Sequence, residues 1–217
     1  MNVHSQNSQS QTSKNARHYA DTCGIAALIL AGGSSSRMGR DKALIPWDGV
    51  PLLQCVGEVA ASCCPQVYVL APREREYQNW LDDRYLFLEE SNPGQGPLAA
   101  LTEGLERLQL DNPAIAWVLL LACDLPQLDS RVLQRWSAQL PHLPPTTLAL
   151  VPRHEDLWQP LCGFYRASAH SSLVDFMQKG ERSFQSWLSR GVAESLSLAE
   201  AEAKMLLNCN QPGDVSE

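Results

Sequence analysis

A glycine- and serine-rich segment after an apolar run carries the residues best suited to chemistry. The run Ile25–Leu30 is followed by Ala31, two glycines, three serines, Arg37, Gly39 and Lys42. Glycines let backbone N–H groups approach a ligand without hindrance from a Cβ atom, and successive N–H groups in a turn form an anion site. Arg37 and Lys42 add the cations that a triphosphate requires. The segment therefore predicts a site for nucleotide phosphates.

The spacing within this segment differs from that of the two best-known phosphate loops. It lacks the Gly-x-x-x-x-Gly-Lys-Ser/Thr pattern of the P-loop and the Gly-x-Gly-x-x-Gly pattern of dinucleotide-binding folds. The alternative is an ordinary turn after a strand, with solvated charges. We favour the phosphate site, because glycines, serines and cations follow the apolar run together.

A single aspartate, Asp124, follows a second apolar run that ends at Cys123. A carboxylate at the end of a buried strand is costly to desolvate unless it has a partner. Magnesium provides one, because it takes one or two protein carboxylates together with substrate phosphate oxygens. The alternative is a turn aspartate before Leu125 and Pro126. With a phosphate loop at the same sheet edge, we predict that Asp124 binds Mg²⁺.

Apolar runs typical of strands alternate with segments typical of helices, and these elements must position the two motifs. Expected strands cover residues 25–30, 67–70, 85–88, 117–122, 147–151, 161–165, 192–196 and 205–208, and expected helices cover 52–63, 74–81, 98–108, 130–140, 169–178 and 183–189. This order predicts a three-layer α/β/α fold with a Rossmann-like, mostly parallel sheet. Ligands of such sheets bind at the carboxyl ends of the strands. We therefore expect Ala31 and Asp124 to meet at one edge.

Composition bounds the class of protein. We expect residues 1–21, which are rich in Ser, Gln and Asn, to form a disordered tail, and residues 22–217 to form a single domain. The net charge of −7 argues against nucleic acid or an anionic membrane as a partner. No apolar run approaches the roughly 20 residues of a membrane span. Seven cysteines without a Cys-x-x-Cys pair argue against a disulfide framework or a zinc site, so we expect a cytoplasmic location.

Residues 30–42 read Leu-Ala-Gly-Gly-Ser-Ser-Ser-Arg-Met-Gly-Arg-Asp-Lys, which resembles the signature loop of the nucleotidyltransferases. The Arg-Met-Gly-x-Asp-Lys form is most similar to the molybdenum cofactor guanylyltransferases, and the resemblance extends over about residues 24–215. It implies a Mg²⁺-dependent enzyme that transfers GMP from GTP to the phosphate of the molybdopterin cofactor and releases pyrophosphate. No covalent enzyme intermediate is needed, and we interpret Cys123 as a small strand-end residue rather than a nucleophile.

Nucleotidyl transfer depends mainly on positioning and electrostatics, which assigns roles to the cations of the loop. We expect Lys42 to offset charge on the α-phosphate and Arg37 to hold the β- and γ-phosphates. For each, the alternative is an exposed loop cation. Asp41 either orients Lys42 or lies at the surface, and both readings stay open. The resemblance places these strand-end and loop residues in the nucleotide site: Leu30, Ala31, Gly32 and Gly33.

The resemblance also implies a guanine pocket and a pterin contact. The family has an acidic residue, more often aspartate, before a Gly-Pro-Leu-Ala helix start, and Glu90 aligns with it ahead of Gly96 and Pro97. An acid suits guanine, whose N1–H and 2-amino group are donors; the alternative for Glu90 is a surface acid. Gln159 and Pro160 match the Gln/His-Pro-Leu segment that contacts the pterin, and the alternative there is an aromatic-rich core strand.

An Asn-x-Asn-x-Pro-x-Asp segment begins at Asn208 and resembles a further motif of the same family. In that motif the second asparagine lies beside the metal and the substrate phosphate. Asn210 would therefore bind Mg²⁺ directly or through water, and the alternative is an asparagine-rich turn. In the family a helix often follows this motif, and we expect that helix to be missing here.

Other functions remain open at the level of sequence. CTP in place of GTP, or a sugar phosphate as acceptor, would use the same chemistry, and residues 90–98 would discriminate them. A nucleotide-binding regulator without turnover would not need a metal site, so Asp124, Lys42 and Asn210 together argue against it. A scaffold that delivers cofactor is a third alternative. We expect contacts with cofactor-synthesis proteins or apo-molybdoenzymes to be transient.

Overall fold

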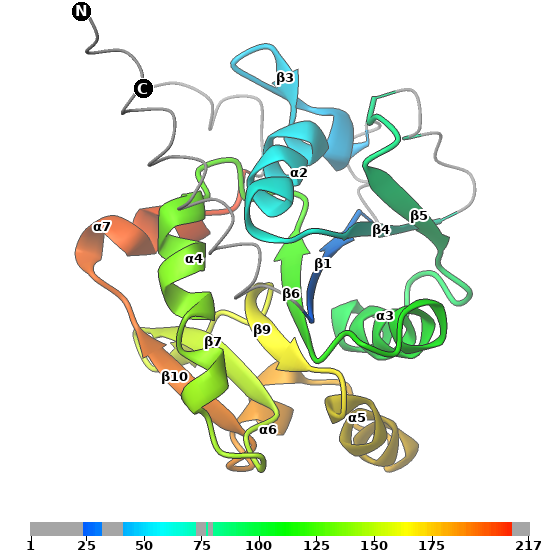
Figure 1. Cartoon of the computed structure of the whole chain (residues 1–217), viewed down its shortest axis with the longest axis vertical. Helices are drawn as coiled ribbons and strands as arrows, with labels where there is room; N and C mark the ends of the chain where they lie inside the picture. The colour runs from blue at the N-terminus through cyan, green and yellow to red at the C-terminus, as the bar shows by residue number, and fades with distance from the viewer. Residues whose placement is uncertain (1–23, 32–40, 73–76, 78–79, 210–217) are drawn as a thin grey trace, which may run out of the picture.

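The computed structural model describes residues 24–31, 41–72, 77 and 80–209. They contain one eight-stranded sheet between two layers of helices (Figure 1). Its strands are β1 (Ile25–Leu30), β4 (Val67–Ala71), β5 (Tyr85–Glu89), β6 (Trp117–Ala122), β7 (Ala149–His154), β8 (Leu157–Trp158), β9 (Cys162–Arg166) and β10 (Ala193–Ser197). The helices are α2 (Leu52–Cys63), α3 (Pro97–Asp111), α4 (Ser130–Ser137), α5 (Ala169–Gln178), α6 (Phe184–Leu188) and α7 (Glu200–Ala203).

The described residues also form several shorter elements. A small antiparallel hairpin consists of β2 (Pro46–Trp47) and β3 (Val50–Pro51), ahead of α2. Single turns of 3₁₀ helix are η2 (Lys42–Leu44), η4 (Leu140–His142) and η5 (Lys204–Leu206). Two of these turns bear on the site, because η2 begins at Lys42 and η5 ends three residues before Cys209.

Sheet order confirms the predicted three-layer, mostly parallel α/β fold. The strands run β10-β7-β9-β6-β1-β4-β5, with β8 paired to β7. Strands β6, β1, β4 and β5 are mutually parallel, as are β7 and β10. Strand β9 is antiparallel to both β6 and β7, so the sheet is mixed rather than wholly parallel. The six residues of β1 and of β6 are all buried, as expected for central strands covered on both faces.

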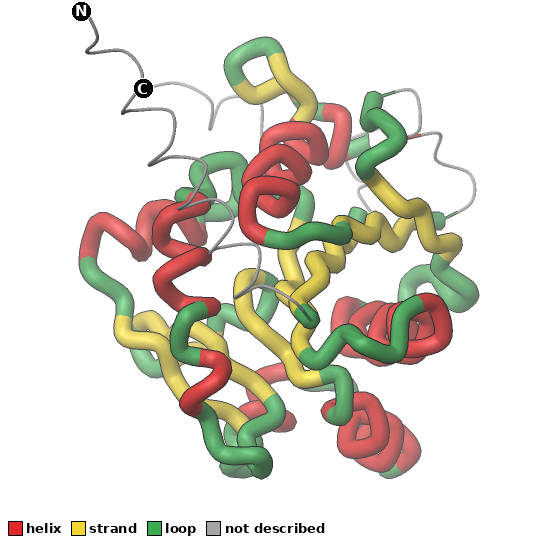
Figure 2. Tube along the Cα trace, in the orientation of Figure 1, coloured by secondary structure: helices red, strands yellow, loops and turns green. Residues whose placement is uncertain are grey.

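Alternate residues of the central strands pack into two separate cores. On one face Ala27 and Ile29 of β1 join a cluster with residues of α2 and α4. On the other face Ala26 and Leu28 join a cluster with residues of α3, α5 and α6. This division follows from the two-residue period of a strand. Figure 2 shows the resulting sandwich, with the strands enclosed between helices.

Two sequence expectations differ from the structure. Residues 205–208 do not form a strand: η5 ends at Leu206, and the chain continues without regular structure to Cys209. Met205 is buried in the α2 and α4 core while Leu207 is 62% exposed, so the apolar run marks a packed turn. The helix expected at 130–140 ends at Ser137 and is followed by η4. The expected helix at 74–81 lies mostly outside the described residues, as does the expected tail at 1–21.

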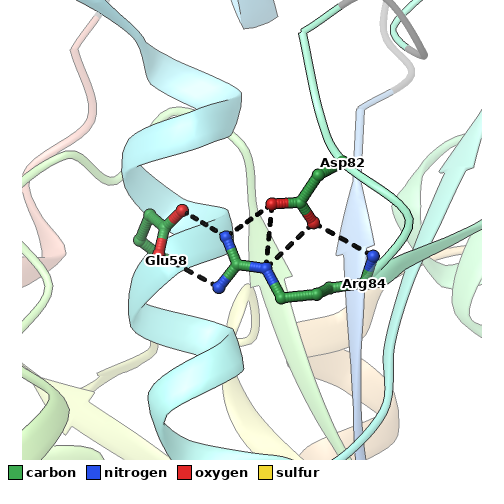
Figure 3. A network of polar contacts seen from close by, with 3 residues as sticks. All are labelled: Glu58, Asp82 and Arg84. Atoms are coloured by element: carbon green, nitrogen blue, oxygen red, sulfur yellow. Dashed lines mark hydrogen bonds and ion pairs between the residues drawn. The ribbon is translucent and has the colours of Figure 1, made fainter.

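A surface network joins α2 to the segment that enters β5. Arg84 lies between Glu58 of α2 and Asp82, with 2.8 Å from its Nη2 to Glu58 Oε1 and 2.9 Å from its Nε to Asp82 Oδ1 (Figure 3). The hydrogen bonds from Arg84 lower the pKa of Asp82 below its usual range. All three side chains are about half exposed, so solvent screens the network and we assign it a small part in stability.

No helix in the described ranges combines the length and apolarity needed to cross a membrane. Six cysteines fall in these ranges, and all are free thiols.

Candidate active site

The carboxyl ends of β1 and β6 lie side by side at one edge of the sheet. The two strands are parallel neighbours with Leu30 opposite Ala122, and the Cys123 amide donates to the Leu30 carbonyl at 3.3 Å. Asp124 follows directly. The Lys42 ammonium lies 2.5 Å from Asp124 Oδ2, although the two residues are 82 positions apart in the sequence. Strand order therefore brings the predicted phosphate-binding lysine onto the predicted metal-binding aspartate.

Asp124 presents a carboxylate oxygen that the described protein does not use. Its Oδ1 is buried and has no hydrogen-bond partner among the described residues. Its backbone carbonyl accepts a hydrogen bond of 2.9 Å from the Cys209 amide, which fixes the C-terminal segment against it. The described ranges contain no group of three or more His, Cys, Asp or Glu residues placed to hold a metal ion together. The chemistry suits a hard cation that takes few protein ligands and completes its shell with phosphate oxygens.

Asp41 is held in a network beside Lys42. The Asp41 carboxylate caps η2 by accepting from the Ala43 amide at 3.1 Å. Its other oxygen accepts a hydrogen bond of 2.6 Å from the Tyr77 hydroxyl, which also lies 2.9 Å from the Ala31 carbonyl oxygen. Asp41 is thus partly buried and hydrogen-bonded at the turn that carries Lys42. The sequence did not indicate Tyr77 as a site residue, because a lone tyrosine in a charged segment gives no signal that it hydrogen-bonds to Asp41.

The expected base-pocket residues lie at the same end of the sheet. Glu90 follows β5 directly, two strands away from β1, and its amide donates to the Ala71 carbonyl at 2.9 Å. Glu90 is only 8% exposed, which rules out its alternative reading as a surface acid. Gly96 and Pro97 are exposed at the start of α3, where Gly96 has a φ of 89° that favours glycine.

The expected pterin segment borders a pocket. Gln159 and Pro160 are half-buried in the loop between β8 and β9, where the Tyr165 hydroxyl donates to the Pro160 carbonyl at 2.7 Å. The Ala122 amide donates to the Leu161 carbonyl, so this loop lies next to the end of β6. Gln159 lines a pocket of about 250 Å³, together with His154, Ala203, Lys204, Leu206 and Leu207. The lining therefore combines three polar residues with the apolar residues Ala203, Leu206 and Leu207.

The remaining predicted site residues divide between strand ends and segments that the structure does not describe. Leu30 and Ala31 are buried at the end of β1, and Asn208 is exposed one residue before Cys209. These predicted residues lie outside the described ranges: Gly32, Gly33, Arg37 and Asn210.

Cys123 does not have the character of a nucleophile. Burial raises its pKa to about 12, and the nearby carboxylate of Asp124 adds to the shift. The thiol is therefore protonated at neutral pH, and a thiol is a far weaker nucleophile than a thiolate. This agrees with its interpretation as a small residue at the end of a strand.

Comparison with known proteins identifies the family. The MobA-like NTP transferase domain matches this chain over residues 27–196, which include Lys42, Glu90, Asp124 and Gln159. The chain belongs to the MobA-like NTP transferase family. As a MobA-like transferase it is a nucleotidyltransferase, which confirms the enzyme class expected from the signature loop.

Relatives place the chain more closely among MobA-like transferases. The probable molybdenum cofactor guanylyltransferase of Trichormus variabilis is 45% identical over 192 residues, covering 88% of this chain and 89% of the relative. That of Synechococcus elongatus is 42% identical and covers 88% and 95%. A solved structure, molybdopterin-guanine dinucleotide biosynthesis protein A from Archaeoglobus fulgidus, has a TM-score of 0.69 at 22% identity and covers 88% and 94%, which shows the shared fold. The resemblance to molybdenum cofactor guanylyltransferases is thus confirmed.

Proposed function

We propose that this MobA-like transferase transfers GMP from GTP to the molybdopterin cofactor. A phosphate oxygen of the cofactor attacks the α-phosphorus of GTP, and the bond from that phosphorus to the bridging oxygen of the β-phosphate breaks. Pyrophosphate leaves, and the guanine dinucleotide form of the cofactor results. The observation that carries this proposal is the contact between Lys42 and Asp124 at the carboxyl edge of the sheet. It occurs in a chain whose relatives are described as probable molybdenum cofactor guanylyltransferases.

The nucleotide phosphates would bind at the end of β1. Lys42 offsets the negative charge that develops on the α-phosphate, which is how preorganised cations lower the barrier to such transfers. Arg37 holds the β- and γ-phosphates that leave. Backbone groups would line the phosphates. They belong to the segment that begins with Leu30 and Ala31 and continues through Gly32 and Gly33. The burial of Leu30 and Ala31 beside β6 supports a rigid start to this site.

Asp124 and Asn210 would hold Mg²⁺. The Oδ1 atom of Asp124 is buried and has no hydrogen-bond partner among the described residues, which supports this assignment, because an unpaired buried carboxylate oxygen is costly. The hydrogen bond from Cys209 to Asp124 supports Asn210 as second ligand, since Cys209 directly precedes it in the chain. When bound, the metal supplies positive charge to the reacting phosphate oxygens.

The two substrates would occupy opposite sides of the Lys42 and Asp124 pair. We assign the guanine base to the β5 end of the sheet, where the Glu90 carboxylate would accept from N1–H and the 2-amino group, beside Gly96 and Pro97. We assign the pterin to the pocket lined by Gln159, beside Pro160 and near Asn208. Its amide and apolar surface suit a flat ring that carries hydrogen-bonding edges. GTP and the molybdopterin cofactor are thus the proposed partners, and the cytoplasm the proposed location.

The decisive test is pyrophosphate release with Mg²⁺ and each of the four nucleoside triphosphates, with and without molybdenum cofactor. We expect release only with GTP plus cofactor. Asp124→Asn should lower the rate by about 100-fold or more, the usual size of a lost electrostatic contribution at a reacting phosphate or oxyanion. The matched control is Asp175→Asn, on the exposed side of α5, which should retain the wild-type rate.

Each other outcome points to one of the alternatives. Release with CTP, or with a sugar phosphate as acceptor, would replace one substrate and keep the chemistry. Tight GTP binding with no release under any condition would favour a regulatory protein and defeat the proposal.

A further inference from the structure

We propose that Tyr77 is a positioning residue for the transfer reaction, acting through Asp41 on the turn that carries Lys42. This inference rests on the proposed function, because it concerns the placement of the lysine that serves the α-phosphate. Among the described residues, the Tyr77 hydroxyl forms no hydrogen bond with Lys42 or Asp124. It donates to Asp41, the residue before Lys42.

The Tyr77 hydroxyl is placed for one strong interaction. The residue is only 1% exposed and packs within the core that lies between the sheet and α2 and α4. A phenol carries a single proton, and of the two acceptors that the described residues provide, the closer is the Asp41 carboxylate at 2.6 Å. Hydrogen bonds to charged acceptors are shorter and stronger than those between neutral groups. Burial of the hydroxyl without this partner would be unfavourable, so its orientation is strongly determined.

Asp41 transmits this constraint to the lysine. Its second oxygen caps η2 through the Ala43 amide, and Lys42 is the first residue of that turn. Ala43 is fully buried, so the turn is anchored on both sides of the Lys42 backbone. From this anchored turn the Lys42 side chain reaches Asp124 Oδ2. The chain of contacts therefore runs from Tyr77 through Asp41 and the turn to Lys42.

The second acceptor of the Tyr77 hydroxyl is the carbonyl of Ala31, the residue that precedes the predicted phosphate-binding segment 32–40. The Ala31 carbonyl lies 2.9 Å from the hydroxyl, and the Ala31 amide donates to the Leu70 carbonyl of β4. Ala31 and Asp41 are the residues that directly precede and follow the predicted phosphate-binding segment 32–40. One buried hydroxyl thus contacts the residues at both ends of that segment.

Tyr77→Phe tests the inference, because it removes the hydroxyl and keeps the ring. We expect kcat for pyrophosphate release to fall about tenfold, the loss that corresponds to one orienting hydrogen bond. The dissociation constant of GTP should change less than threefold, because an interaction that matters only in the transition state lowers kcat rather than binding. Both quantities are measured on the full chain with Mg²⁺.

Tyr68→Phe is the matched control. Tyr68 is also 1% exposed and also donates its hydroxyl to an aspartate, Asp111, but it packs in the opposite core, on the α3 side of the sheet. The two substitutions should lower the melting temperature to a similar extent. Only Tyr77→Phe should lower kcat, so a general loss of stability is separated from loss of positioning.

A double substitution decides whether Tyr77 acts through Asp41. In an Asp41→Ala background, Tyr77→Phe should have little further effect on kcat, because the carboxylate through which the hydroxyl acts on the turn is already gone, and the remaining contact with the Ala31 carbonyl does not reach Lys42. An undiminished tenfold loss in that background would overturn the inference, as would an unchanged kcat in Tyr77→Phe or an equal loss in Tyr68→Phe. Wild-type protein that releases no pyrophosphate would instead defeat the proposed function, and the inference with it.

Discussion

At the scale of single residues, Lys42 and Asp124 form a pair whose members stabilise each other and whose charges are both needed for the proposed chemistry. Their side chains are 24% and 14% exposed, so water screens the pair only in part. Removing one member of such a pair leaves the other charge poorly solvated, whereas removing both does not. Stability and activity should therefore respond differently to substitution at this site.

Lys42→Met should lower pyrophosphate release by about 100-fold or more, because the charge that serves the α-phosphate is lost. It should also lower the free energy of unfolding by about 1–2 kcal/mol, since Asp124 is left without its cation. The double variant Lys42→Met with Asp124→Asn should regain most of this stability and none of the activity. Urea unfolding and a pyrophosphate assay measure the two effects. A double variant no more stable than Lys42→Met would show that the ion pair does not contribute as argued.

At the scale of elements, α4 illustrates how a cap sets the start of a helix that covers the sheet. Asp129 precedes the helix, and its carboxylate accepts from the Arg131 amide at 2.8 Å. Val132, Leu133 and Trp136 of α4 are buried on the sheet. Hydrogen bonds from the side chain and then the backbone of Arg131 lower the pKa of Asp129 below its usual range.

Asp129→Ala should cost about 1 kcal/mol of stability at pH 7, the usual value of an N-cap. Because the folded-state pKa of Asp129 is lowered, its charge stabilises the protein above the ordinary aspartate pKa of about 4 and this effect is lost as pH falls through the lower folded-state value. The difference from wild type should therefore shrink as the pH is lowered from 7 to below about 4. Asp129→Asn keeps a capping side chain and should lose less at pH 7. Urea unfolding across this pH range checks both, and a pH-independent difference would contradict the argument.

At the scale of the whole molecule, the site draws together parts of the chain that are remote in sequence. Hydrogen bonds at one edge of the sheet join Tyr77 to Asp41 and join both Lys42 and Cys209 to Asp124. Asp41 and Lys42 are neighbours in the sequence, so the two sets are continuous. A ligand bound there would therefore hold N-terminal, central and C-terminal segments together. Such a ligand stabilises only the folded state, because the unfolded chain has no such site.

GTP with Mg²⁺ should raise the thermal unfolding midpoint. Free ligand at 100 times its dissociation constant adds about 2.7 kcal/mol to the folded state. Chelation of the metal with EDTA should remove most of the shift, and Asp124→Asn should show a smaller shift than Asp175→Asn. Differential scanning fluorimetry measures all of these. An equal shift in EDTA would argue against a metal at Asp124.

The sequence predicted the elements that depend on local pattern. The bounds of β1, β6, α2 and α5 agree with the expected ranges, because each is a continuous apolar run or a clear helical period. The same reasoning failed at 205–208, where a short apolar run proved to be a turn. A run of this length has too few residues for its period to be distinguished, and the packing of Met205 decided its conformation.

For the site, the sequence by itself was enough to select Lys42 and Asp124 as candidates. Both are charged residues that follow apolar runs typical of strands, and their residue types indicate phosphate and metal binding. Only the tertiary structure decided that the two are in contact, that Glu90 is buried, that β9 runs antiparallel and that Tyr77 holds Asp41. The physical reason is the separation along the sequence over which each kind of information acts. Hydrophobic period and turn chemistry report what each segment requires of its immediate surroundings, whereas contacts across 36 or 82 positions depend on the order in which strands join the sheet.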